Sequence, residues 1–369
     1  MALYPKQITD ALSTVRYPGT GKDIVSSEMV EDDIRIEGNK VSFSLIFEKA
    51  NDPFINSLVK ACEQAILTYV GADVDIKGNI KVKIPERIVN EPEKPLSHVK
   101  NIIAVASGKG GVGKSTIAAN LAVSLARQGY KVGLLDADIF GPSVPKMFGL
   151  ESARPILENV NGRDLIVPEE KYGVKLLSIG FFVDPENAIL WRGGMASNAL
   201  KQLITDANWG DLDFFLLDMP PGTSDIHLTL VQTLAVTGAI VVSTPQQVAL
   251  ADARKGINMF LQDKINVPVL GLIENMAWFT PKELPENKYY IFGKEGVKRL
   301  GEELNIPLIG QIPLVQDVCE SGDAGSPIVL DDNSIVGTAF AELARNMVAQ
   351  VNYRNEHLDP TKKVEVNRK

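Results

Sequence analysis

A glycine-rich segment with two lysines is the part of the sequence whose residue types most clearly predict chemistry. Residues 108–116 read Gly-Lys-Gly-Gly-Val-Gly-Lys-Ser-Thr and match the phosphate-loop pattern G-x-x-x-x-G-K-[ST]. Glycines let backbone N–H groups turn toward phosphates, and the start of the following helix adds partial positive charge. We therefore expect Lys114 to reach the β- and γ-phosphates of ATP and the Ser115 hydroxyl to bind Mg²⁺. The predicted ATP-binding residues of this loop are Gly108, Lys109, Gly110, Gly111, Val112, Gly113, Lys114, Ser115 and Thr116.

Two acidic motifs are predicted to complete the site. Asp218 ends an apolar run in Leu-Asp-Met-Pro-Pro-Gly-Thr, where Mg²⁺ and its waters need a carboxylate, and Gly222 of the same motif could offer its N–H to the γ-phosphate. Asp136 and Asp138 follow another apolar run, and their i, i+2 spacing on an extended chain points both carboxylates the same way. One can hold a metal-bound water while the other orients the attacking water, and we expect Asp136 to serve the Mg²⁺ site together with Ser115 and Asp218. The alternative is that these aspartates only cap turns.

Lys109 is an additional lysine early in the loop. It cannot comfortably reach the phosphates of its own site beside Lys114, so we expect it to cross a dimer interface, as an arginine finger does. The alternative is a solvated surface lysine.

The loop also fits the dinucleotide pattern G-x-G-x-x-G, with Asp136 about 20 residues further on as a ribose ligand. That hypothesis gives no role to Lys114, Ser115 or Asp218, and the ATP site is favoured.

Strands and helices alternate in the chain that surrounds these motifs. Continuous apolar runs separated by helical patterns predict an α/β fold, a mostly parallel P-loop NTPase sheet with helices on both faces. The strands are expected at 102–106, 132–135, 214–217, 239–242, 267–273 and 307–312, and two of the helices at 116–128 and 250–263.

The N-terminal part has a different pattern and predicts a small α+β domain. Its elements are expected at 7–15 (helix), 34–36 and 41–47 (strands), 53–70 (helix) and 80–84 (strand). A segment with three prolines follows and predicts an extended linker. The predicted organisation is a small α+β domain at 1–85, a linker at 86–98, a P-loop ATPase domain at 99–354 and a polar tail at 355–369.

Composition excludes several classes of protein. The 369 residues contain 38 basic and 46 acidic side chains, a net charge of −8, which disfavours nucleic acid as the main partner. No apolar run reaches the length of about 18 residues that a membrane span needs. The N-terminus shows no signal-peptide pattern. The two cysteines, Cys62 and Cys319, exclude a disulfide scaffold and fit a reducing compartment. We expect a cytoplasmic protein with neither a nucleic-acid nor a membrane partner.

Taken together, the motifs resemble those of the deviant Walker A ATPases, the MinD and ParA relatives whose mark is K-G-G-x-G-K-[ST]. More narrowly, residues 99–345 resemble the Mrp/ApbC family of iron–sulfur cluster carrier ATPases, and the N-terminal module is similar to SufT. The resemblance rests on Asp136-Ala-Asp-Ile-Phe-Gly-Pro-Ser143, Trp191-Arg-Gly-Gly-Met195, Leu217-Asp-Met-Pro-Pro-Gly-Thr223, Thr244-Pro-Gln-Gln247 and Ile273-Glu-Asn-Met276.

The resemblance implies a Mg²⁺-dependent ATPase that delivers iron–sulfur clusters to apoproteins. It further implies a homodimer that encloses two ATP molecules, with Lys109 acting in the partner's site and Asp138 close to the attacking water. Asn275 would contact the adenine by the same analogy. The alternative is that Asn275 caps the end of a strand.

One departure concerns the cluster ligands. Family members with a bridging cluster carry a CxxC after the Glu-Asn-Met segment, whereas residues 276–293 contain no cysteine here. A cluster needs four thiolates or substitutes, and Cys319 would supply two per dimer. A structural role for Cys319 remains the alternative, and Cys62 is expected to pack in a core.

Two other functions stay open: a MinD- or ParA-like positioning ATPase, and a small-molecule phosphotransferase with its site in 148–209.

Overall fold

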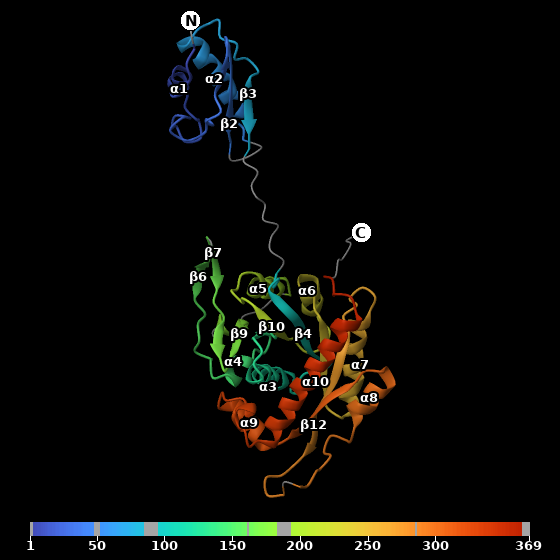
Figure 1. The fold of residues 1–369 in the computed structure, drawn as a ribbon. Helices are drawn as coiled ribbons and strands as arrows, with labels where there is room; N and C mark the ends of the chain where they lie inside the picture. The colour runs from blue at the N-terminus through green and yellow to red at the C-terminus, as the bar shows by residue number, and fades with distance from the viewer. Residues whose placement is uncertain are drawn as a thin grey trace. The chain divides into compact units, whose positions relative to one another are not determined.

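The chain forms two compact units, residues Met1–Pro92 and Glu93–Lys369. The computed structural model describes residues 3–47, 52–84, 95–160, 162–182, 193–284 and 286–363 (Figure 1). Most of the predicted linker, and Trp191 and Arg192 of the quoted motifs, lie outside these ranges. The domain limits drawn from the sequence therefore stay a prediction.

The N-terminal unit has a small sheet and two helices. Its three-stranded sheet has the order β1-β2-β3, in which β1 and β2 are antiparallel while β2 and β3 are parallel. Buried apolar side chains from β2 and α2, among them Phe43, Leu45, Leu58 and Ile66, form its core. The elements are α1 (Pro5–Leu12), β1 (Arg35–Glu37), β2 (Lys40–Ile46), α2 (Ile55–Tyr69) and β3 (Ile80–Lys83), close to their predicted positions.

An eight-stranded sheet is the centre of the second unit. Its order is β13-β12-β11-β4-β10-β5-β9-β8, and every neighbouring pair is parallel except β8 with β9. The strands are β4 (Val99–Ser107), β5 (Val132–Asp136), β8 (Glu169–Lys171), β9 (Val174–Ser178), β10 (Leu212–Asp218), β11 (Gly238–Ser243), β12 (Val269–Phe279) and β13 (Leu308–Leu314). The predicted mostly parallel α/β fold is confirmed.

Every residue of β5 and β11 is buried. Burial of successive side chains, which point to opposite faces, shows that helices cover both faces of this sheet. α3 and α10 pack against each other, while α7 and α8 pack on β11 and β12 respectively. The helices are α3 (Lys114–Arg127), α4 (Val144–Met147), α5 (Gly193–Thr205), α6 (Asp225–Thr233), α7 (Gln247–Leu261), α8 (Gly296–Leu304), α9 (Gln316–Asp323) and α10 (Ile335–His357), with single 3₁₀ turns at Ile179–Phe181 and Ile328–Leu330. α10 extends three residues into the predicted tail.

Sequence patterns missed the elements between α4 and α5. β8 and β9 are short, and β6 (Leu157–Val160) and β7 (Arg163–Ile166) form a hairpin whose residues are mostly exposed. Such segments lack the continuous apolar run that marks a buried strand.

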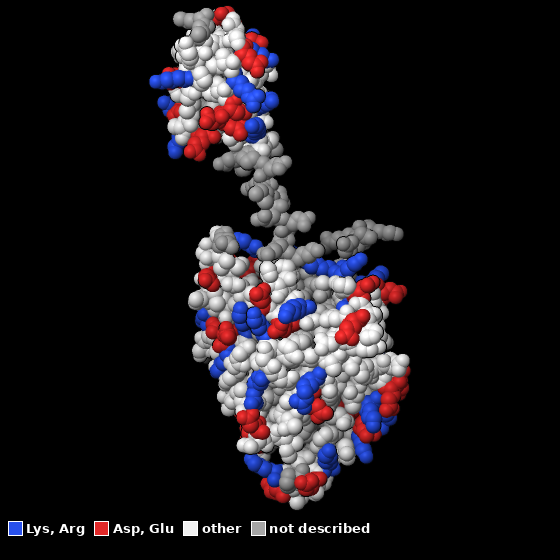
Figure 2. Space-filling model, in the orientation of Figure 1, with Lys and Arg blue, Asp and Glu red and all other residues white. Residues whose placement is uncertain are grey.

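The surface carries mixed charge. On the face shown in Figure 2, Lys and Arg side chains lie among Asp and Glu side chains, as expected from 38 basic and 46 acidic residues. Within the described part of the chain, no helix has both the length and the apolar character needed to cross a membrane.

Candidate nucleotide-binding site

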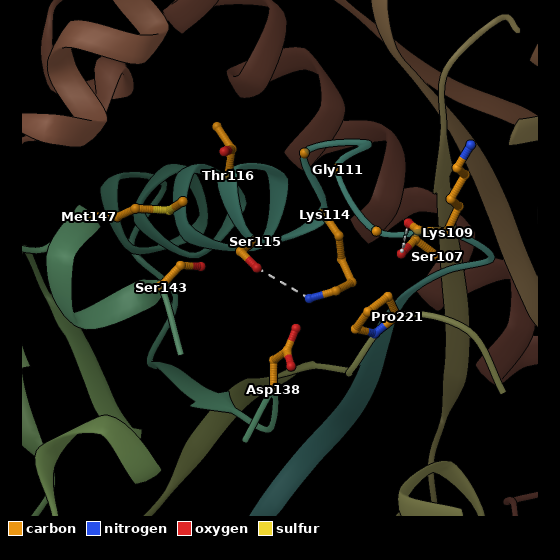
Figure 3. Close-up of a pocket in the computed structure, with 12 residues that line it drawn as sticks. Ser107, Lys109, Gly111, Lys114, Ser115, Thr116, Asp138, Ser143, Met147 and Pro221 are labelled. Atoms are coloured by element: carbon orange, nitrogen blue, oxygen red, sulfur yellow. Dashed lines mark hydrogen bonds between the residues drawn. The ribbon is translucent and has the colours of Figure 1, made fainter. Parts of the chain in front are cut away.

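A cavity of about 200 Å³ lies where β4 ends and α3 begins (Figure 3). The carboxyl ends of parallel strands are where open α/β sheets bind ligands. Most of the predicted loop residues line it, together with Asp138. Four further lining residues were not predicted as site residues, namely Ser107, Ser143, Met147 and Pro221. Ser143 and Pro221 belong to the quoted acidic motifs, so their position beside Asp138 and Asp218 was the available signal.

The glycines shape the loop backbone. Gly111 and Gly113 have φ values of +81° and +83°, a left-handed conformation that side chains disfavour. A Cβ at Gly113 would lie 2.2 Å from Nδ2 of Asn275, and one at Gly108 would lie 2.1 Å from the carbonyl group of Asp252 in α7. Glycine is therefore required both for the turn and for the close packing of the loop on its neighbours.

Lys114, which lines the cavity, forms a buried ion pair with Asp218. Nζ of Lys114 lies 2.5 Å from Oδ1 of Asp218, and the two side chains are 6% and 0% exposed. Nζ also donates a hydrogen bond to Oγ of Ser115 at 3.2 Å. The predicted strand-end position of Asp218 brings it here, because β10 lies between β4 and β5.

The second carboxylate oxygen of Asp218 is left without a hydrogen-bond partner among the described residues. This atom, Oδ2, is buried, and a buried carboxylate oxygen without a partner is unfavourable. The described residues contain no group of three or more His, Cys, Asp or Glu side chains placed to hold a metal. A Mg²⁺ ion usually takes one or two carboxylates and completes its shell with phosphate and water. The residues present therefore fit Mg²⁺ bound together with a nucleotide.

Asp136 lies beside Asp218 at the end of the neighbouring strand. Its surroundings differ from those of Asp138. Asp136 and Asp218 are opposite each other on neighbouring strands. Asp136 is fully buried, and its oxygens accept hydrogen bonds from the N–H groups of Asp138 and Val144 and from the Ser178 hydroxyl, at 3.1, 3.3 and 3.0 Å. Burial, with the nearby charge of Asp218, raises the pKa of Asp136 to about 8.

Asp138 is half-buried and lines the cavity. Burial raises its pKa, with the Lys114 ammonium acting in the opposite direction and Asp218 adding to the rise. A carboxylate with a raised pKa is better suited to accept a proton near neutral pH. The two aspartates thus differ: Asp138 faces the cavity, whereas Asp136 supports the backbone behind it.

Lys109 is exposed, and in Figure 3 its side chain points away from Lys114 and Ser115. Beside it, the N–H of Gly222 donates to the carbonyl of Ser107 at 2.9 Å, and the Ser107 hydroxyl donates to the carbonyl of Lys109 at 3.0 Å. Gly222 has a φ of +80°. Its N–H must leave Ser107 before it can meet a phosphate.

Asn275 is buried in β12 and holds the phosphate loop. Its Nδ2 donates to the carbonyl of Val112 at 2.8 Å. The predicted contact with adenine stays a prediction.

His227 is a buried residue near the site that sequence reasoning left without a role. It is the third residue of α6, and its Nδ1 accepts the backbone N–H of Ser224 at 3.1 Å. Burial lowers the pKa of His227 to about 4. The spacing from Ser224 to His227 resembles a capping box and was the available signal.

The two cysteines differ in exposure. Cys62 is buried in the N-terminal core, where burial, with the nearby charge of Glu63, raises its pKa to about 12. Cys319 is exposed on α9, with Sγ 3.9 Å from Oδ2 of Asp323. α9 packs on α4, the helix that carries Met147 of the cavity wall.

Comparison with known proteins connects this geometry to a family. Residues 98–348 match the family described as NUBPL iron-transfer P-loop NTPase, and residues 5–77 match the family described as iron-sulfur cluster assembly protein. An iron-sulfur cluster carrier protein of Synechocystis is 41% identical over 349 residues, 93% of this chain and 98% of that protein. A protein of the same name from Aquifex aeolicus is 50% identical over 255 residues, 68% of each chain.

Among solved structures, a nucleotide-binding protein of Archaeoglobus fulgidus in complex with ADP is 37% identical. It has a TM-score of 0.55, and the match covers 65% of this chain and 92% of that one. The resemblance drawn from the motifs is thereby confirmed. The chain belongs to the NUBPL-type iron-transfer P-loop NTPases and carries the small iron–sulfur cluster assembly domain ahead of its P-loop NTPase domain.

Proposed function

We propose that this protein is a Mg²⁺-dependent ATPase that acts as a cytoplasmic homodimer and carries iron–sulfur clusters to apoproteins. The observation that carries the proposal is the ion pair of Lys114 with Asp218, next to a left-handed glycine loop. The second carboxylate oxygen of Asp218 has no hydrogen-bond partner in the described part of the chain. The iron–sulfur cluster carrier proteins of Synechocystis and Aquifex aeolicus support the cluster-delivery part.

ATP binding would reorganise the Lys114 contacts. The N–H groups of the loop and of the start of α3 would donate hydrogen bonds to the β- and γ-phosphates, and Lys114 would exchange Asp218 for phosphate oxygens. Ser115 and Asp218 would hold Mg²⁺, which neutralises charge on the phosphates when bound. Asp138, facing the cavity, would orient the attacking water.

Lys109 supports a dimeric mechanism. Its ammonium points away from its own Ser115 and is exposed, so it is available to a site on a second copy of the chain. A lysine donated across an interface would stabilise charge on the transferred phosphoryl group, as arginine fingers do. Hydrolysis would then depend on association of two chains.

The cluster itself would be cargo with few thiolate ligands. Cys319 is exposed, whereas the buried Cys62 is a poor ligand because its raised pKa disfavours the thiolate. Two copies of Cys319 would supply two of the four ligands that a cluster needs. We therefore expect a labile cluster that is readily passed to an acceptor.

The test is ATP-dependent transfer. The protein is reconstituted anaerobically with iron and sulfide and then mixed with an apo-enzyme whose activity requires a [4Fe–4S] cluster. We expect acceptor activity to return faster with Mg·ATP than without it, and Lys114→Ala to abolish the difference. Cluster transfer at the same rate in the Lys114→Ala variant would contradict the coupling of hydrolysis to delivery.

A further inference from the structure

A second cavity, of about 740 Å³, lies at the opposite end of β4 from the phosphate loop. Its walls come from three places: the start of β4 with the residues before it, the turn that precedes β11, and the end of α10 with the residues after it. A hydrogen bond of 2.9 Å between the side chains of Asn355 and Asn101 joins α10 to β4 here. The volume falls within the range of about 300–1,000 Å³ typical of small-molecule sites.

Arg354 of α10 is the most unusual residue in this cavity. It is 7% exposed. Its Nη1 donates to Oδ1 of Asn355 at 3.1 Å, and its Nη2 donates to the carbonyl of Asp359 at 2.5 Å and to the Thr361 hydroxyl at 2.8 Å. Its Nε is buried and has no hydrogen-bond partner among the described residues.

The charge of Arg354 is also poorly compensated. Asp359 is the carboxylate that acts on its charge, but the contact with Asp359 is to the backbone carbonyl. A buried cation is unfavourable unless an anion pairs with it. The guanidinium therefore keeps one buried N–H without a hydrogen-bond partner, and no carboxylate among the described residues is in direct contact with it.

The other residues of the wall favour an anion with an apolar part. Lys100 and Lys362 add positive charge, although Lys100 is paired with Asp213 at 2.8 Å, and the described wall contains no Asp or Glu. Leu96, Ile102 and Leu358 contribute apolar surface. A wall that combines cationic donors with aliphatic side chains is suited to an amphipathic anion.

We propose that this cavity binds a small organic anion, a carboxylate or phosphate group on an apolar body, with its head group on Arg354. Carboxylate and phosphate share the geometry that a guanidinium recognises. Such a ligand would contact both the start of β4 and the end of α10. β4 leads directly to the phosphate loop. This site is separate from the proposed nucleotide site and does not depend on it.

Calorimetric titration of the full chain with octyl phosphate and with octanoate tests the proposal. Excess Mg·ATP is present to keep both compounds away from the phosphate loop. We expect one molecule bound per chain, and the tighter of the two compounds identifies the head group. Octanol, which has the same apolar body without charge, should give no saturable heat.

Three variants locate the binding. Arg354→Met keeps an unbranched apolar side chain but removes the guanidinium, and should weaken binding at least about tenfold because the charge-assisted hydrogen bonds to the head group are lost. Arg345→Met, at an exposed position of the same helix, should bind like the unaltered chain. Ala235→Phe should block binding by filling the cavity from another wall, which covers the case in which Arg354→Met does not fold. Absence of saturable binding by either anion, or binding unchanged in Arg354→Met and Ala235→Phe, would overturn the proposal.

Discussion

The ammonium group of Lys114 lies 2.5 Å from Oδ1 of Asp218, although 104 positions separate the two residues in the chain. Both side chains are buried, so each neutralises a charge that would otherwise be unfavourable in the interior. The pair places the phosphate-binding cation beside the carboxylate proposed to hold Mg²⁺. Nucleotide binding and metal binding at this site are therefore expected to depend on one another.

Lys114→Ala should weaken ATP binding by at least about a hundredfold, because charge-assisted hydrogen bonds to two phosphates are lost. Isothermal titration of the variant with Mg·ATP measures this change. Lys201→Ala, on an exposed face of α5, is the matched control and should bind ATP normally. Unchanged affinity in Lys114→Ala would remove the phosphate-loop assignment.

Lys109→Ala should keep ATP binding but lose most hydrolysis, since the ammonium is proposed to act on a partner's phosphates. Asp138→Ala should be inactive for a different reason, the loss of water orientation. Mixing the two variants creates heterodimers in which one site has an intact Asp138 and a donated Lys109. Random exchange of equal amounts should restore about a quarter of the activity, since half the dimers are mixed and each has one complete site. No recovery at any mixing ratio would show that Lys109 does not act across a dimer.

The affinity of the protein for Mg²⁺, measured with ATP present, should rise as the pH is raised through the neutral range. The pKa of Asp136 is raised to about 8, so at lower pH this carboxyl is mostly protonated and contributes less negative charge near the metal. The rise can reach about tenfold per pH unit. Asp136→Asn should flatten the profile, while Asp263→Asn, at an exposed position, should not. An equally steep dependence of Mg²⁺ affinity on pH in Asp136→Asn would show that Asp136 is not the titrating group.

His227→Gln should make the protein less sensitive to acid. The folded-state pKa of His227 is lowered from 6.5 to about 4, so the unfolded chain takes up a proton first as the pH falls. The contribution of neutral His227 to the free energy of unfolding is fully present above pH 6.5. It is lost as the pH falls from 6.5 to 4, by roughly 3 kcal/mol in total. Glutamine can keep the capping contact with Ser224 because it serves at this position in capping boxes.

Chemical denaturation at a series of pH values measures this difference. The free energy of unfolding of the unaltered chain should fall relative to His227→Gln as the pH drops to 4. His357→Gln, which alters an exposed histidine, should behave like the unaltered chain. Parallel curves for the unaltered chain and His227→Gln would contradict the assigned pKa.

Cys319→Ser should remove the cluster that anaerobic reconstitution can load, while Cys62→Ser should leave it unchanged. Cys319 is exposed and Cys62 is buried with its pKa raised to about 12, so only Cys319 offers an accessible thiolate. Absorbance in the thiolate-to-iron region and iron analysis measure the loading, which should be low and labile in the unaltered chain. A stable, near-stoichiometric cluster that survives Cys319→Ser would refute this ligand assignment.

The sequence by itself determined the phosphate loop, the positions of most of the buried strands along the chain, and the family. Each depends on local information: a left-handed turn requires glycine at Gly111 and Gly113, and continuous apolar runs require burial on both faces. Asp218 could be assigned to the site because strand ends of a parallel sheet meet at one edge.

Only the tertiary structure decided how these residues share the site. Spacing gave Asp136 and Asp138 the same direction, yet Ser178 and the N–H of Val144 hold Asp136 behind the cavity that Asp138 faces. The contact of Asn275 with Val112 joins strand β12 to the loop across 163 positions of the chain. The cavity around Arg354 likewise forms from segments that are far apart in sequence. Hydrogen bonding and burial depend on which strands and helices pack together, and packing between distant segments leaves no periodic pattern in the sequence.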